Sequence, residues 1–362
     1  MSKDNSCCCS GGSCCNMESI TPYNENDKWV IGKVYTLNGN IPVVSTNLHF
    51  KDILGAWKVR WGIGRMNYKI SPGLYAIGKP KHSSPVLVSA NYKLTFDTLR
   101  KELSGIDCWL LILDTKGINV WCAAGKGTFG TDELVSRILK TGLSDVVTHR
   151  KLVLPQLGAT GVSAHEVKKQ TGFSVVYGPV RAKDLKTFLD TGFTATEEMR
   201  TVKFTIWDRL VLTPMELVTA AKSSLMVFGV IFILNLFVSR PFGLFDFIAY
   251  AGSVITGTVI TPLLLPFIPG RAFAWKGWLL GLLWTLGFIW YSNWFATGFL
   301  LLAIGYLLVL PSVSAYLAMN FTGSSTYTSF SGVIKEMKIA VPLISISLVA
   351  GIVLLLINCF LS

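Results

Sequence analysis

The chain has 362 residues, of which 51% are apolar and only 15% charged, against about 25% charged in ordinary soluble domains. Residues 1–216 hold 27 Lys and Arg and 19 Asp and Glu, whereas residues 217–362 hold only 6 and 2. This division excludes a single water-soluble domain and predicts a soluble front half followed by a membrane domain. The net charge of +12 is not gathered into a basic, aromatic-rich groove, so it does not indicate a nucleic-acid partner.

Residues 1–28 are rich in Ser, Gly, Asn and Cys and have few apolar side chains, so we expect a disordered tail. The start of the chain lacks the apolar stretch of a secretory signal, so we expect the domain at 29–216 to stay in the cytoplasm. Thiolates favour soft metals, and a tail without a specific role is an equally good interpretation of its cysteines. The candidates for Hg(II) capture are Cys7, Cys8, Cys9, Cys14 and Cys15.

From residue 29 onward the front half is predicted to alternate between strands and helices. Two β-rich runs within 29–45 flank Asn38-Gly39-Asn40 and indicate a hairpin. Strands are then expected over 85–91, 108–115, 151–156 and 173–179, and helices over 95–103, 131–140, 163–170 and 182–190. Thr131 is expected to cap the second of these helices, and Ser163 and Glu166 have the spacing of a capping box. The repeat predicts an α/β fold whose parallel sheet is covered on both faces and binds ligands at the carboxyl ends of its strands.

The remaining residues, 217–362, are predicted to form an all-α transmembrane domain of five helices. The expected spans lie at about 223–239, 244–268, 272–292, 294–318 and 339–361. The polar segment at 319–337, short of helix signals, is expected to fold back on the front domain, and a plain connecting loop is the alternative. With the front half inside, the inner loops hold Arg271, Lys276, Lys335 and Lys338, and the outer loops hold only Arg240. The spans contain almost no ionisable side chains, so we interpret them as an anchor rather than an ion pathway.

The loop between the predicted strand at 108–115 and the predicted helix at 131–140 carries the most informative residues. It contains Gly125-Lys126, but a phosphate-binding Walker motif is excluded because Val120 stands where Gly is needed and Gly127 where Ser or Thr is needed. Cys122 follows the carboxyl end of a strand and lies in a short helix-compatible run. A thiol there is a candidate metal ligand or nucleophile, and a small buried apolar Cys is the alternative.

The segment Asn119–Lys126, which reads NVWCAAGK, resembles the cap helix of the corrinoid proteins of microbial mercury methylation. The wider stretch at about 85–190 resembles the corrinoid domain of corrinoid iron–sulfur proteins. This resemblance implies a Rossmann-like corrinoid-binding domain in which Cys122 coordinates the cobalt of a base-off cobalamin or related corrinoid. The five predicted membrane helices agree with the mercury-methylation family rather than with the soluble iron–sulfur proteins.

The resemblance implies a corrinoid-dependent methyltransferase in the cytoplasmic membrane that transfers a methyl group to Hg(II), giving methylmercury. The implied partners are a ferredoxin-type protein with two [4Fe–4S] clusters and a methyltetrahydrofolate-type donor or its methyltransferase. Residues of three segments are implied to contact the corrinoid: Asn119, Val120, Trp121, Cys122, Ala123, Ala124, Gly125 and Lys126; Gln156, Gly158, Gly161 and Val162; and Tyr177, Gly178 and Pro179.

Two other functions stay open at this point. One is a corrinoid methyl carrier of acetyl-CoA metabolism, and the other is a non-catalytic membrane protein that binds or transports cobalamin. None of the four His residues stands in the Asp-x-His-x-x-Gly motif that supplies a lower His ligand in other corrinoid domains. No C-x2-C-x2-C-x3-C run is present, so no iron–sulfur cluster is expected in this chain and electrons must come from another protein.

Overall fold

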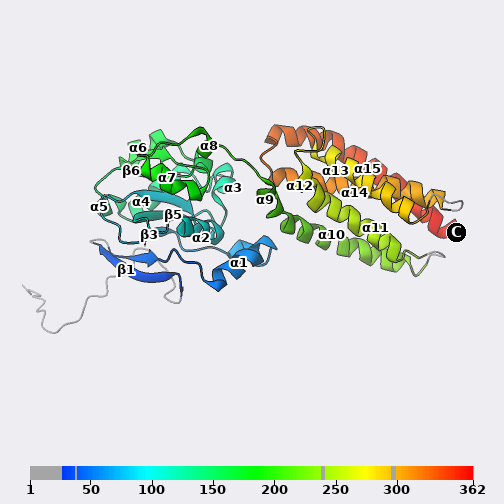
Figure 1. Ribbon diagram of the computed structural model, residues 1–362, viewed down its shortest axis with the longest axis horizontal. Coiled ribbons are helices and arrows are strands. Elements are labelled where there is room, and N and C mark those ends of the chain that lie inside the picture. The colour runs from blue at the N-terminus through cyan, green and yellow to red at the C-terminus, as the bar shows by residue number, and fades with distance from the viewer. Residues whose placement is uncertain (1–26, 37–38, 238–240, 295–298, 362) are drawn as a thin grey trace, which may run out of the picture. The chain divides into compact units, whose positions relative to one another are not determined.

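The computed structural model describes residues 27–36, 39–237, 241–294 and 299–361. The chain divides into two units. The sheet unit comprises Gly64–Thr201 together with the chain up to Trp57. The helical unit comprises Val202–Ser362 together with Lys58–Ile63. Figure 1 shows strands only in the sheet unit and bundled long helices in the helical unit.

A seven-stranded sheet in the order β1-β2-β3-β5-β4-β6-β7 forms the centre of the sheet unit. Its strands are β1 (Val30–Thr36), β2 (Gly39–Val44), β3 (Gly73–Ile77), β4 (Val86–Ala90), β5 (Cys108–Leu113), β6 (Lys151–Leu154) and β7 (Ser174–Tyr177). The predicted hairpin is confirmed because β1 pairs antiparallel with β2, and β5, β4, β6 and β7 are mutually parallel as expected. A wholly parallel sheet is wrong, since β3 pairs antiparallel with β5.

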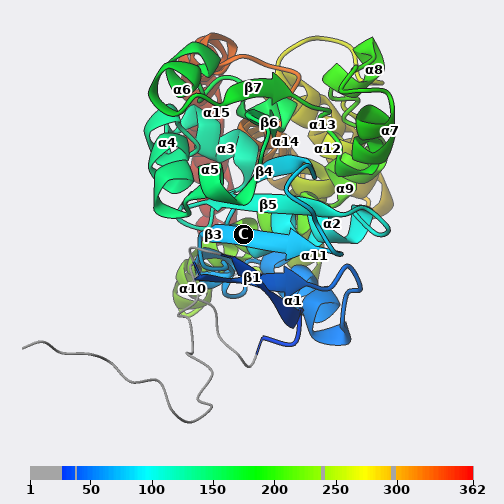
Figure 2. The same cartoon turned by 90° about the vertical axis from the view of Figure 1, so that its left-hand side faces the viewer.

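The helices of the sheet unit cover both faces of the sheet, as predicted. They are α1 (Phe50–Arg60, which continues into the other unit), η1 (Arg65–Asn67), α2 (Lys93–Glu102), α3 (Val120–Gly125), α4 (Thr131–Lys140), α5 (Leu143–Val146), η2 (Gln156–Gly158), α6 (Ala164–Thr171), η3 (Ala182–Asp184), α7 (Leu185–Asp190) and α8 (Glu197–Arg200). Figure 2 shows α3, α4, α5 and α6 on one side of the sheet and α2 and α7 on the other.

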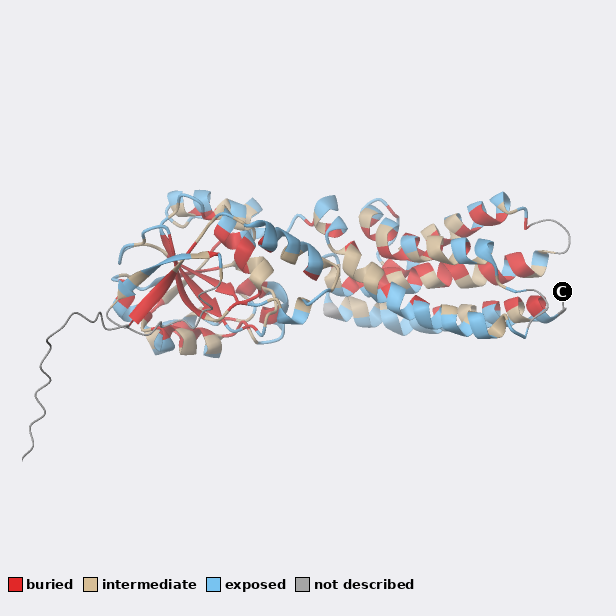
Figure 3. Ribbon diagram, turned by 90° about the horizontal axis from the view of Figure 1, so that it is seen from below, coloured by how far each residue is buried: buried red, intermediate tan, exposed pale blue. Residues whose placement is uncertain are grey.

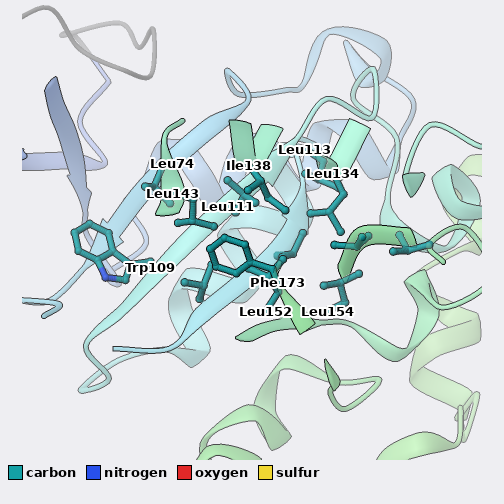
Figure 4. Close-up of a cluster of buried hydrophobic side chains, with 14 of the residues drawn as sticks. Leu74, Trp109, Leu111, Leu113, Leu134, Ile138, Leu143, Leu152, Leu154 and Phe173 are labelled. Atoms are coloured by element: carbon teal, nitrogen blue, oxygen red, sulfur yellow. The ribbon is translucent and has the colours of Figure 1, made fainter. Parts of the chain in front are cut away.

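Alternating side chains of the central strand β5 fill two separate hydrophobic cores. Leu111 and Leu113 pack with Leu134 and Ile138 of α4 and with Phe173, as Figure 4 shows. Their neighbours on β5 point to the opposite face, where they meet α2 and α7. Burial on both faces explains why this strand is a continuous apolar run in the sequence.

The two predicted helix caps are wrong in detail. Gly130 is the N-cap of α4, and the hydroxyl oxygen of Thr131 instead accepts a hydrogen bond from the backbone N–H of Ser163 at 2.8 Å. Ser163 does precede α6, but its side chain makes no capping hydrogen bond. A contact between α4 and the loop before α6 therefore replaces the local cap.

A buried ionic cluster ties α2 to α1 and to the end of β2. Arg100 is fully buried and binds Asp97 at 2.8 Å and Asp52 at 2.7 Å, while Lys93 binds the same two carboxylates at 2.7 Å. Burial alone would raise the pKa of Asp52, but the hydrogen bond and charge of Lys93, followed by the charge of Arg100, hold that pKa below its ordinary value. The Asp52 carboxyl group is therefore held as an anion within the sheet unit.

The helical unit consists of long apolar helices joined by short connections. They are α9 (Ile206–Leu210), α10 (Thr213–Leu234), α11 (Leu244–Ile255), the π-helical turn Thr256–Ile260, α12 (Thr261–Leu264), α13 (Phe273–Tyr291), α14 (Leu300–Asn320), η5 (Phe321–Ser324) and α15 (Phe330–Leu361). Within the described residues, four helical segments are long and apolar enough to cross a membrane: Ile206–Leu234, Leu244–Leu264, Leu300–Ser324 and Ser331–Phe360. Figure 3 shows many exposed residues along the helices of this unit, as expected for side chains that face lipid.

The third predicted span, 272–292, coincides with the helix α13 but is not among these four segments. Lys276 and four tryptophans reduce the apolar character of α13, so five spans remain a prediction. The predicted loop at 319–337 is wrong, because α14 and η5 continue to Ser324 and α15 begins at Phe330. Polar Ser, Thr and Gly residues are tolerated in these helix ends.

Candidate functional site

Cys122 lies on α3, a helix of six residues that follows β5. Asn119 is the N-cap, and its side-chain oxygen accepts a hydrogen bond from the backbone N–H of Cys122 at 3.0 Å. The thiol of Cys122 is free and exposed. Gly125 and Lys126 lie one turn further on and are exposed as well, and a Cβ at Gly125 would meet nothing within 4 Å. The thiol therefore lies on an open face of α3, as a metal ligand or nucleophile requires.

The β5–α3 loop, residues 114–119, fixes the start of this helix. Lys116 and Gly117 both have positive φ angles, of 57° and 74°, so the chain turns sharply there. The hydroxyl of Thr115 donates to the carbonyl oxygen of Ile118 at 2.6 Å and closes the turn. The loop is thus a rigid support for Asn119 and Cys122.

Asn91, at the carboxyl end of β4, binds the β5–α3 loop through hydrogen bonds of its side chain. Its side-chain oxygen accepts hydrogen bonds from the backbone N–H groups of Thr115 at 3.1 Å and Gly117 at 3.0 Å. The Thr115 hydroxyl lies 2.9 Å from the same oxygen and shares its one proton between Asn91 and Ile118. Its side-chain nitrogen donates to Asp114 at 3.1 Å. Asn91 is 1% exposed, and both polar atoms of its buried amide have partners. The sequence analysis missed it, although a polar side chain directly after a buried strand is a usable signal.

The inner face of α3 packs on the segment between β6 and α6, residues 155–163. A Cβ on Gly161 would lie 3.0 Å from the Cα of Ala124 and closer still to the carbonyl oxygen of Phe129, so only glycine fits there. The hydroxyl of Tyr177, the last residue of β7, donates to the carbonyl oxygen of Val162 at 2.8 Å. These contacts bring three of the predicted segments together beneath Cys122.

The position of α3 coincides with the topological switch point of the parallel strands. The chain leaves β4 into α2 on one face of the sheet and leaves β6 into α6 on the other face. Ligands of such sheets bind where neighbouring strands diverge in this way, at their carboxyl ends. Because α3 contacts both β4 and η2, which follows β6, Cys122 lies at this edge.

The remaining predicted contact residues divide into exposed and buried positions. Trp121 is 39% exposed beside Cys122, and Gln156 accepts a hydrogen bond from Arg200 at 3.1 Å. The others are buried in the sheet unit and support the edge from within: Val120, Ala123, Ala124, Gly158, Val162, Gly178 and Pro179. The five cysteines predicted to capture Hg(II), Cys7, Cys8, Cys9, Cys14 and Cys15, lie outside the described residues.

The histidines serve other contacts in the structure. The rings of His49, His82 and His149 each bond a backbone carbonyl oxygen, and His165 is exposed near Glu166. Within the described part of the chain, no group of three or more His, Cys, Asp or Glu side chains is arranged to hold a metal ion.

The fold and the site define an α/β domain with a ligand-binding edge at a switch point, followed by membrane-length helices. Residues 63–189 match the family model of the CO dehydrogenase/acetyl-CoA synthase delta subunit, which begins earlier than the expected resemblance at about residue 85. The chain is also similar to gamma subunits of the acetyl-CoA decarbonylase/synthase complex. It is 37% identical over 124 residues to that of Methanopyrus kandleri, covering 34% of this chain and 26% of the relative.

Two further gamma subunits show the same partial similarity. The identity is 34% over 122 residues for Methanocaldococcus jannaschii, covering 33% of this chain and 25% of the relative. It is 33% over 135 residues for Archaeoglobus fulgidus, covering 37% of this chain and 28% of the relative. The chain thus spans about a quarter of the length of these relatives, and the family match at residues 63–189 falls in the α/β part of the chain.

Replacement of Asn91 by Ala is expected to loosen the β5–α3 loop. The backbone N–H of Gly117 would lose its acceptor, which costs about 1–3 kcal/mol for a group left unsatisfied, and the N–H and hydroxyl of Thr115 would keep only the carbonyl oxygens of Leu113 and Ile118. We expect faster hydrogen exchange in a peptide covering residues 114–122, measured on the full chain in detergent. Thr141→Val is the matched control, because Thr141 is 3% exposed and its hydroxyl bonds only carbonyls of α4. Equal exchange at 114–122 in both variants would refute the positioning role of Asn91.

Proposed function

We propose that the sheet unit binds a corrinoid at the α3 edge and takes part in methyl transfer, with Cys122 as the protein ligand of cobalt. The observation that carries this proposal is the free, exposed thiol of Cys122 on a helix seated at the switch point. The similarity to subunits of the acetyl-CoA decarbonylase/synthase complex supports it independently.

The residues present fit such a group. A thiolate is a strong donor to soft and borderline transition metals, and Cys122 supplies one without competing side-chain ligands nearby. Gly125, one turn from Cys122, has no side chain, and a Cβ there would meet nothing within 4 Å. A planar macrocycle therefore has room to approach the sulfur atom.

The chain's own residues would act mainly by position. The Asn119 side chain fixes the backbone at Cys122, and Asn91 fixes the loop before it, so the Cys122 sulfur is held at one place. Trp121, the preceding residue, offers an exposed apolar surface, and Lys126 is a cation at the C-cap of α3. A bound corrinoid would supply the methyl group, carried on its cobalt. The Cys122 thiolate would hold that metal and would supply it with electron density, as a strong donor does.

The identity of the methyl acceptor separates two candidate functions. The comparisons support a corrinoid methyl carrier of one-carbon and acetyl-CoA metabolism better than mercury methylation, because the similar proteins are subunits of an acetyl-CoA complex. Methyl transfer to Hg(II) is the second candidate. It is favoured by the NVWCAAGK segment with its exposed thiol and by the membrane-length helices, which lie outside the matched region.

A single-turnover assay distinguishes these functions. The full chain in detergent is loaded with methylcobalamin and then offered Hg(II). For the mercury function we expect one methylmercury per bound corrinoid and then a stall, until a methyltetrahydrofolate-type donor and a reduced ferredoxin with two [4Fe–4S] clusters restore turnover. Sustained turnover without an electron source would contradict carbanion-type transfer. No methylmercury, together with methyl exchange into the acetyl-CoA complex, would favour the carrier. Corrinoid binding without either transfer would favour the non-catalytic alternative.

We further propose that the helical unit lies in the cytoplasmic membrane with the sheet unit in the cytoplasm. The support is the distribution of cations between helix ends, with Arg271, Lys276, Lys335 and Lys338 at the inner ends. A cysteine introduced at Thr328, in the segment before α15, should react with a membrane-impermeant maleimide only after permeabilisation. A cysteine introduced at Asn293, after α13, should react without it. The reverse pattern would contradict this orientation.

A further inference from the structure

The helical unit contains a cationic pocket that the proposed methyl transfer does not use. Its volume is about 720 Å³, and it lies between the end of α12, the start of α13 and the start of α15. Three cations and one carboxylate line it: Arg271, Lys276, Lys335 and Glu336. The excess of cations gives the pocket a positive charge, which suits an anionic ligand.

The polar contacts of the pocket leave two of these cations for a ligand. Lys276 donates to the carbonyl oxygen of Leu265 at 2.5 Å, and a carboxylate oxygen of Glu336 accepts the backbone N–H of Ala274 at 2.7 Å. Arg271 and Lys335 are exposed side chains that make no hydrogen bond or ion pair with the described residues. Both line the same cavity from different helix ends.

An apolar groove of about 400 Å³ continues from this pocket along α13 and α15. The two cavities share Ala272, Glu336 and Ile339 in their walls, so they adjoin. Leu343 and Ile344 of α15 line the groove farther along, and Trp275 and Trp278 stack on each other at 5.5 Å at its edge. Tryptophans of this kind mark the level of the lipid headgroups in membrane helices.

We propose that this pocket and groove together bind one anionic phospholipid, with its phosphate between Arg271 and Lys335 and an acyl chain in the groove. A free phosphate ion would use the cations and leave the adjoining groove without a role. A neutral lipid would use the groove and leave the two cations unpaired. Cations near the membrane surface attract anionic headgroups, so the position at the end of membrane-length helices agrees with this ligand. The proposal is independent of corrinoid binding.

Native mass spectrometry of the full chain in detergent tests this site, with phosphatidylglycerol or phosphatidylcholine added as the probe. The wild-type chain should retain phosphatidylglycerol preferentially. Arg271→Gln combined with Lys335→Gln should weaken this retention roughly 30-fold, because two surface cations are lost. Leu343→Trp, which fills the groove without changing charge, should weaken it too. Leu343 is 62% exposed, so the larger side chain does not disturb the core.

Lys338→Gln is the matched control for Lys335→Gln, because both are exposed cations on α15 and only Lys335 lines the pocket. Equal loss of retention in these two single variants would overturn the proposal in favour of general surface charge. Displacement of the lipid by inorganic phosphate, with no effect of Leu343→Trp, would identify a free-phosphate site instead. Equal retention of the two lipids by the wild-type chain would also overturn it.

Discussion

The Cys122→Ala chain should bind corrinoid without a sulfur ligand, and its rate of methyl transfer should fall by more than about 100-fold. This loss exceeds the effect of removing a group that only orients a metal ligand. The physical reason is that, within the described residues, no second metal-binding cluster exists to replace the thiolate. The measurement is the anaerobic absorption spectrum of the full chain reconstituted with cobalamin. An unchanged spectrum would remove Cys122 from the cobalt and with it the proposed site.

The control is Cys108→Ala, which removes a thiol of very different character. Cys108 is fully buried in β5, and burial raises the pKa of its thiol to about 12, so it stays protonated at neutral pH. The spectrum of this variant should match that of the wild-type chain. Cys122→His adds a second comparison, because imidazole can bind cobalt but donates less electron density. It should restore a ligated spectrum and leave methyl transfer low.

The regular part of the sheet unit could be predicted because its strands are apolar on both faces and its helices alternate with them. β4, β5, β6 and β7 were all located in this way. The strand β3 was missed, since GLYAI is a short run within a segment that has no clear alternation. Its pairing with β5 depends on contacts distant in sequence, which local patterns do not contain.

In the candidate site, too, features that depend on neighbouring residues could be predicted from the sequence, and features that depend on strand pairing could not. The sequence indicated Cys122 and the helix around it, because a thiol after a strand is a local feature. It did not indicate Asn91, which lies 24 residues before Thr115 and reaches it only through the pairing of β4 with β5. The buried ionic cluster was missed for the same reason, since Asp52 and Arg100 are far apart in the chain.

Replacement of Arg100 by Ala should destabilise the sheet unit by about 3–5 kcal/mol, the usual cost of breaking a buried ion pair. Asp97 and Asp52 would each lose a partner, and the carbonyl oxygens of Ser45 and Asn47 would lose the donors that bind them at 2.6 and 2.8 Å. The measurement is urea unfolding of the full chain in detergent, followed by hydrogen exchange in peptides of α2 and β3. A free energy of unfolding within roughly 0.5 kcal/mol of the wild-type value, which is the error of such a comparison, would contradict this prediction.

Arg137→Ala is the matched control, because Arg137 binds Glu133 at 2.7 Å on the partly exposed surface of α4. Loss of such a pair costs about 0.2–1 kcal/mol of unfolding free energy. The larger loss expected for Arg100→Ala is therefore due to the burial of its ion pairs. The pH dependence should separate them as well. Because the pKa of Asp52 lies below its ordinary value of 3.8, its contribution is present above that pH and is lost as the pH falls further. Without Arg100 the pKa of Asp52 rises toward that value, so the Arg100→Ala chain should lose less stability on acidification than the wild-type or Arg137→Ala chains.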